Sequence, residues 1–171
     1  MRRVLLTLTV CGVIASAGAM VRADDWPQFR GPDGQGHSDA HGLPTEWGET
    51  RNITWKVPVP GRGWSSPIVA DGRVWLTTAT QAGREGSLRL LAFDVASGRP
   101  ILDVEVFRLR NSALLNPKNS LASPTPIVEG DRVYVHFGAE GTAAVSTTGE
   151  IVWKTRIQYE SQHGNGGSPV L

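Results

Sequence analysis

One segment of the sequence occurs twice, and this repeat limits the chain to a small set of folds. SSPIVADGRVWL at 65–76 aligns without a gap with PTPIVEGDRVYV at 124–135, 59 positions later. GSPVL at 167–171 begins a third copy, 43 positions after the second. Repeats of about 40 to 60 residues are typical of propellers and solenoids, in which each unit buries an apolar face against the next. The repeat therefore predicts similar units packed in chain order.

Each copy has the pattern of short β-strands. Apolar residues alternate with other residues at a period of two in the segments 74–76 and 133–135. No long segment has the 3.6-residue apolar stripe of a helix. Turn dipeptides separate the apolar runs; they are Asp71-Gly72, Ser97-Gly98 and Thr148-Gly149. Units of four short strands predict an all-β propeller with four-stranded antiparallel blades.

The first copy is longer than the second, and an extra strand precedes it. We expect the added residues to form a longer loop around 81–87. NITWKVPV at 52–59 resembles the fourth strand of a blade, as in IVWKTRI at 151–157, so we expect a strand that latches the ring. Closed propellers have about four to eight blades. We therefore expect an incomplete propeller, either a fragment of a longer protein or a chain that closes its ring by self-association.

The first 23 residues have the pattern of a secretory signal peptide. Arg2 and Arg3 precede an apolar stretch, and VRA at 21–23 is a small-residue cleavage site. The apolar stretch is short for an uncleaved membrane anchor. Cys11 lies inside it and follows a valine rather than a small residue, so we expect no lipid anchor. The interpretation is an exported protein, periplasmic or extracellular, without a membrane anchor or a cysteine after cleavage.

Composition and local pattern divide the chain into three parts. Residues 1–23 are the expected signal peptide, 24–51 an irregular capping segment, and 52–171 a partial propeller with a latch strand, two blades and the start of a third. The capping segment is rich in Pro and Gly, and we expect Trp26 and Phe29 to anchor it. Removing three basic residues with 1–23 leaves 14 basic and 16 acidic residues, a net charge of −2. This balance predicts no nucleic-acid partner.

The repeats resemble the pyrroloquinoline-quinone-like (PQQ-like) repeats of secreted bacterial β-propellers. The likeness rests on SSPIV…DGRVWLTT and LLAFDVASGRPIL, and more closely on WPQFRGP, NPKNSLASPTPIV and HGNGGSPVL, which occur in this order. It implies a quinoprotein alcohol dehydrogenase-like propeller. In repeat type the chain is also similar to the propeller of the outer-membrane assembly machinery.

The sequence and the resemblance indicate two classes of function. The first is a binding or scaffold module that holds a protein or small-molecule ligand at its rim loops or at an exposed strand edge. The second, which the resemblance implies, is the N-terminal part of a dehydrogenase that uses PQQ and Ca²⁺. Such dehydrogenases often stack a disulfide of adjacent cysteines on the quinone, and residues 24–171 contain no cysteine. No catalytic residue, metal ligand or cofactor can be assigned, so we favour the binding module.

Five polar residues are candidates for the channel or the rim of the propeller. Two of them precede the third copy, where innermost strands would line the channel, and one lies in a strand of the second copy, at the position of Thr77 in the first. The other two lie in the polar connection between the copies, at a rim where propellers bind partners. The candidates are His136, His163, Asn165, Lys118 and Asn119.

Overall fold

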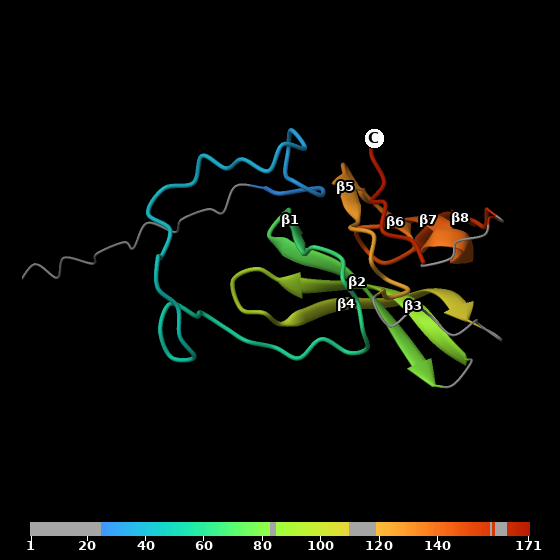
Figure 1. Cartoon of the computed structure of the whole chain (residues 1–171), viewed down its shortest axis with the longest axis horizontal. Helices are drawn as coiled ribbons and strands as arrows, with labels where there is room; N and C mark the ends of the chain where they lie inside the picture. The colour runs from blue at the N-terminus through green and yellow to red at the C-terminus, as the bar shows by residue number, and fades with distance from the viewer. Residues whose placement is uncertain (1–24, 83–84, 110–118, 158, 160–163) are drawn as a thin grey trace, which may run out of the picture.

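A computed structural model describes residues 25–82, 85–109, 119–157, 159 and 164–171. The expected signal peptide and the candidates Lys118 and His163 lie outside the described residues. The strands form two four-stranded antiparallel sheets, each in chain order (Figure 1). The fold is all-β, and the sheets are two blades of an incomplete propeller, as predicted. No helix in the described part of the chain is long and apolar enough to cross a bilayer.

Blade 1 consists of β1 (Ile68–Ala70), β2 (Arg73–Ala82), β3 (Glu85–Asp94) and β4 (Pro100–Leu109). The turn between β1 and β2 has positive φ at both Asp71 and Gly72, which is the geometry of a tight hairpin turn. The prediction of a longer loop around 81–87 is wrong, because β2 and β3 stay paired as far as Ala82 and Glu85. The Thr-rich end of β2 favours extended backbone, so the added residues lengthen a hairpin.

Blade 2 consists of β5 (Ile127–Glu129), β6 (Arg132–His136), β7 (Thr142–Ser146) and β8 (Ile151–Thr155). A short 3₁₀ helix, η1 (Gly138–Glu140), joins β6 to β7 where blade 1 has its long hairpin. The strand order and turns otherwise match those of blade 1. The two copies of the repeat therefore fold into equivalent structures.

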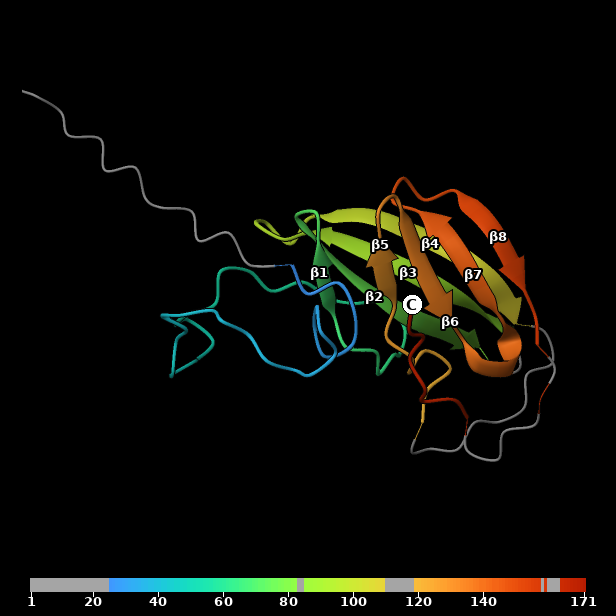
Figure 2. The same ribbon diagram turned by 90° about the horizontal axis from the view of Figure 1, so that it is seen from above.

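The two sheets pack face to face and bury one apolar core (Figure 2). Alternate residues of each strand supply it, because side chains on a strand point to opposite faces. Blade 1 contributes Ile68, Trp75, Leu88 and Leu90, and blade 2 contributes Val133, Val135, Phe137 and Val145, all at most 3% exposed. Burial of each such side chain stabilises the fold by about 1.5–3 kcal/mol. Neither sheet could bury this face alone.

Residues 52–59 form no strand in the structure; that they latch a closed ring stays a prediction. No described strand lies beside this segment to supply ladder hydrogen bonds. Residues 52–60, called the strap below, instead cross the face of blade 1 that points away from blade 2. Trp55 Nε1 donates to the carbonyl of Val95 at 2.9 Å, and at the far end Thr78 Oγ1 donates to the carbonyl of Pro60 at 2.6 Å. Side chains, rather than strand pairing, hold the strap.

Candidate binding site at the rim between the blades

The N-terminal segment lies against the innermost strands of both blades. Trp26 forms an antiparallel bridge with Val69 of β1, and the carbonyl of Pro27 accepts a hydrogen bond from the N–H of Val128 in β5 at 2.9 Å. The Trp26 ring packs on Gly31, where a Cβ would lie 2.8 Å from the ring. The free edges of β1 and β5, which face the axis of a propeller, are therefore both occupied by this segment.

Three hydroxyl groups lie beside this axial edge at equivalent positions of the three repeats. Ser66 N–H donates to Thr125 Oγ1 at 3.0 Å, and Thr125 N–H donates to Ser168 Oγ at 3.0 Å. Among the described residues, no group of three His, Cys, Asp or Glu side chains could hold a metal ion. Ser66, Thr125 and Ser168 are neutral donors and acceptors.

The structure brings two of the sequence candidates together at one loop cluster. Gly164 packs directly on Asn119, where a Cβ would lie 2.6 Å from Nδ2, and Asn165 packs on Gly138 in the same way. Asn119 Oδ1 accepts hydrogen bonds from Ser120 N–H and Ser123 Oγ. Asn119 therefore orders the turn that precedes β5.

His136 lies at the end of β6 and belongs to a different environment. Its Nδ1 is 2.8 Å from Thr142 Oγ1 on the neighbouring strand. Burial lowers the pKa of His136 because the charged imidazolium loses solvent. This favours the neutral ring and a cross-strand structural contact.

A groove of about 500 Å³ opens between the blades at the outer rim, beside the ends of the outermost strands β4 and β8. Its lining is aromatic and charged, with more cations than anions. The lining residues are Phe107, Arg108, Glu140, Lys154, Thr155 and Arg156. Both blades contribute to it, so the groove exists only when they are packed together.

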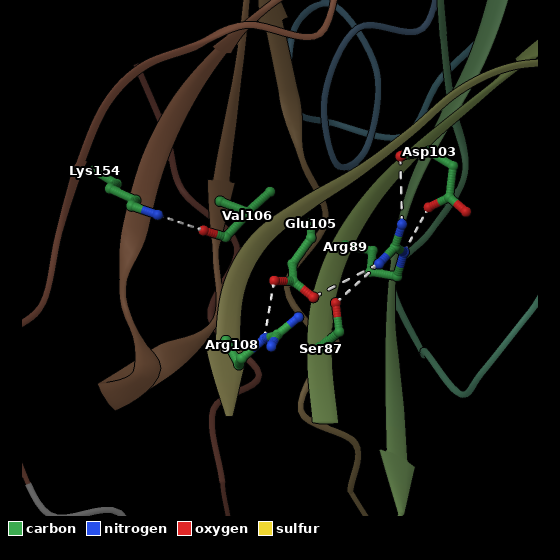
Figure 3. Close-up of polar contacts among 7 residues, drawn as sticks. All are labelled: Ser87, Arg89, Asp103, Glu105, Val106, Arg108 and Lys154. Carbon is green, nitrogen blue, oxygen red and sulfur yellow. Dashed lines mark hydrogen bonds and ion pairs between the residues drawn. The ribbon is translucent and has the colours of Figure 1, made fainter. Parts of the chain in front are cut away.

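Two cations of blade 2 reach across the groove to the edge of blade 1. Lys154 Nζ donates to the carbonyl of Val106 at 3.1 Å (Figure 3), and Arg156 Nη2 donates to the carbonyl of Arg108 at 3.3 Å. Both cationic groups also lie over the ring of Phe107, at 5.5 and 5.7 Å from its centroid. These contacts fix the cations and protect the backbone edge of β4 from pairing with another strand.

A network of opposite charges lies on the face of blade 1 that points away from blade 2 (Figure 3). Arg89 Nε contacts Asp103 Oδ1 at 2.6 Å, and Arg89 Nη1 lies 3.9 Å from Glu105 Oε2. Arg108 Nε contacts Glu105 Oε1 at 3.2 Å. A hydrogen bond from Ser87 lowers the pKa of Glu105, and the two arginines lower it further. The acidic pair of blade 1 is thus neutralised inside its own blade.

Sequence reasoning did not identify the groove. A signal was present, because the repeat alignment places Asp103 and Glu105 opposite Lys154 and Arg156, 51 positions later. Two acids of the first copy are therefore two bases in the second. This reversal of charge indicates a site only if residues 154 and 156 face the neighbouring blade, which the sequence does not show.

Comparison with known proteins identifies the repeat. A family model of PQQ-like repeats, described as outer membrane protein assembly factor BamB, matches residues 40–170. No curated protein sequence matches the chain. The match covers both blades and the groove between them.

Proposed function

The chain belongs to the family described as outer membrane protein assembly factor BamB, and from this premise we propose that it is an exported propeller module. We propose that it binds a partner protein at its rim and catalyses no reaction. The observation that carries the proposal is the groove between β4 and β8, whose cations are held in place but lie on the surface. Loops and grooves at propeller rims are common sites of partner binding.

The quinone-dependent dehydrogenase fits the described residues less well. PQQ and Ca²⁺ would lie over the central channel and would need carboxylate and amide oxygens there. Ser66, Thr125 and Ser168 lie at the axial edge of the blades, and the edges of β1 and β5 bind Trp26 and Pro27. The hydroxyls of Thr125 and Ser168 already accept backbone hydrogen bonds, and three hydroxyls do not make a ligand set for Ca²⁺.

Export can be tested separately from binding. The full chain, and a variant lacking residues 1–23, would be expressed in a bacterium with two membranes, and both would be located by cell fractionation. We expect the full chain in the periplasm or the medium and the variant in the cytoplasm. Equal cytoplasmic retention of both would overturn the proposed export.

Binding is tested in the same cells with a photo-crosslinking residue at the groove. We would place it at Thr155, which lines the groove, and as a control at Thr45, which is exposed outside the two blades. We expect a discrete protein adduct, identified by mass spectrometry, only from position 155. Adducts of equal yield from both positions, or none from either, would count against a rim-binding module. Reduction of an electron-accepting dye by the chain loaded with PQQ and Ca²⁺ would favour the dehydrogenase instead.

A further inference from the structure

We propose that the groove between the blades binds an extended acidic segment of a partner protein, with carboxylates two residues apart that meet Lys154 and Arg156. This inference rests on the proposed function, since it names the chemistry of the partner at the same rim. The evidence for it is that the two blades balance the charges of their side chains differently.

In blade 1 the side chains of the sheet neutralise their own charges. Asp103 and Glu105 of β4 lie beside Arg89 of β3, and Glu105 is paired with Arg89 in the strand register. The repeat places Gly141 of blade 2 at the position of Arg89. Blade 2 therefore has two cations at the equivalent sites, and among the described residues no acidic side chain is within ion-pair distance of either.

A glycine is required at position 141 by the groove itself. A Cβ on Gly141 would lie 2.4 Å from Cζ of Phe107, and the residue has φ of +137°. Phe107 is the ring over which both cations lie. The arrangement that holds Lys154 and Arg156 in place thus also excludes a charged side chain at position 141, where blade 1 has Arg89.

Within the described residues neither Lys154 nor Arg156 forms an ion pair. Each donates one hydrogen bond to a neutral carbonyl, and each remains exposed. An ammonium and a guanidinium have further N–H donors after one bond is made. These donors are available to a carboxylate, and the side chains lose little freedom on binding because they are already held.

Lys154 in β8 and Arg156, directly after its end, are two positions apart in the sequence, as are alternate residues of an extended peptide. Residues two apart on a strand are separated by about 6.5–7 Å and point to the same face. Alternate acidic side chains of an extended segment have the same spacing, so they can meet both cations at once. Glu140 also lines the groove, and a peptide with alternate acidic residues can place a neutral residue beside this carboxylate, whereas the continuous negative charge of a nucleic acid cannot avoid it. The net charge of −2 for residues 24–171 disfavours it as well.

The test uses the full chain and a fluorescent peptide of four alternating Thr-Glu pairs, with binding followed by anisotropy at low salt. We expect binding that weakens with salt and is lost when Gln replaces Glu in the peptide. The double variant Lys154→Gln and Arg156→Gln should bind about tenfold more weakly, the loss expected for two exposed ion pairs. Lys56→Gln with Arg132→Gln removes one exposed lysine and one exposed arginine elsewhere and should bind within about twofold of the parent chain.

A charge-reversal variant keeps the test decisive if the neutral variant folds poorly. Lys154→Glu with Arg156→Glu should lose the acidic peptide and gain a peptide of alternating Thr-Lys pairs. Equal weakening by the control double variant would overturn the inference. So would tighter binding of a single-stranded DNA of similar charge, or binding to the parent chain that Lys154→Gln and Arg156→Gln leave unchanged. A crosslinked adduct at Thr155 combined with no peptide binding would reject the acidic ligand and leave the proposed rim-binding module standing.

Discussion

The backbone N–H of Thr125 donates a hydrogen bond to the hydroxyl of Ser168, at 3.0 Å. The same bond occurs one repeat earlier, where the N–H of Ser66 donates to the hydroxyl of Thr125. These three residues occupy equivalent positions of the repeat, each directly before a proline. A hydroxyl side chain at this position therefore joins each repeat to the one before it.

Replacing Thr125 with Val tests this connection. Valine has the shape of threonine but no acceptor for the Ser66 N–H, and Thr125 is 2% exposed. We expect the free energy of unfolding to fall by about 1–2 kcal/mol, the cost of a buried donor without a partner. Urea unfolding would measure it, with the exposed Thr45→Val as control, for which a change within about 0.5 kcal/mol is expected. Equal effects would mean that the hydroxyl does not stabilise the contact between repeats.

Gly141→Ala tests the close approach of Phe107 to β7. The added Cβ would meet Phe107 Cζ at 2.4 Å and the carbonyl of Thr155 at 2.7 Å. Because of these close contacts and the positive φ, we expect a loss of about 3 kcal/mol in the free energy of unfolding. Gly130→Ala is the matched control, because Gly130 also has positive φ but has open space around its Cβ position. We expect it to cost about 1 kcal/mol. Similar losses for the two variants in urea unfolding would show that the contact with Phe107 is not what makes Gly141→Ala destabilising.

The repeat alignment was sufficient to predict the fold, because the residues that it aligns determine local structure. Turn dipeptides such as Asp71-Gly72 lie between strands as expected, and the alternating residues Val133 and Val135 are fully buried. The strap differs from its prediction for a physical reason. Residues 52–59 have strand-like composition, but a strand also needs a neighbouring strand to pair with, which local sequence does not report.

The rim groove was beyond prediction because it depends on contacts between blades. Lys154 is recognisable in sequence as an exposed strand residue, but its bond to the carbonyl of Val106 follows from how the second sheet packs on the first. Asn119 and His136 are candidates because of their polar side chains. In the structure both make local hydrogen bonds that order a turn and a strand pair. Whether either contacts a ligand stays a prediction.

The neutral state of His136 predicts a pH dependence of stability. Because burial lowers its pKa below the ordinary value of 6.5, the unfolded chain binds more protons as the pH falls below that value. Stability should therefore decrease as the pH drops from about 7.5 to 5.5. His136→Gln removes the titrating group and should flatten this part of the profile, measured as the urea midpoint at each pH. His41→Gln, at an exposed position outside the blades, should leave the slope unchanged; a flattened slope in this control would contradict the assignment.

Trp55 is predicted to hold the strap against blade 1. Its indole N–H bonds to the carbonyl of Val95, and its ring packs on Gly98, where a Cβ would lie 2.6 Å away. Trp55→Phe removes the hydrogen bond and should cost about 1 kcal/mol, whereas Trp55→Ala also removes the ring and should cost about 2 kcal/mol. Release of the strap should speed trypsin cleavage after Lys56, in the order Ala, Phe, parent chain.

Trp47→Ala is the control for Trp55, because Trp47 is 66% exposed and its loss should change neither stability nor the rate of cleavage after Lys56. The strap lies over the face of blade 1 that carries Leu91 and Phe93, which are 2% and 4% exposed although they lie outside the core between the blades. Hydrogen exchange at the Phe93 amide should therefore accelerate in Trp55→Ala, since opening the strap exposes this face to solvent. Unchanged cleavage and exchange in Trp55→Ala would show that other contacts, such as the Thr78–Pro60 hydrogen bond, are sufficient to hold the strap.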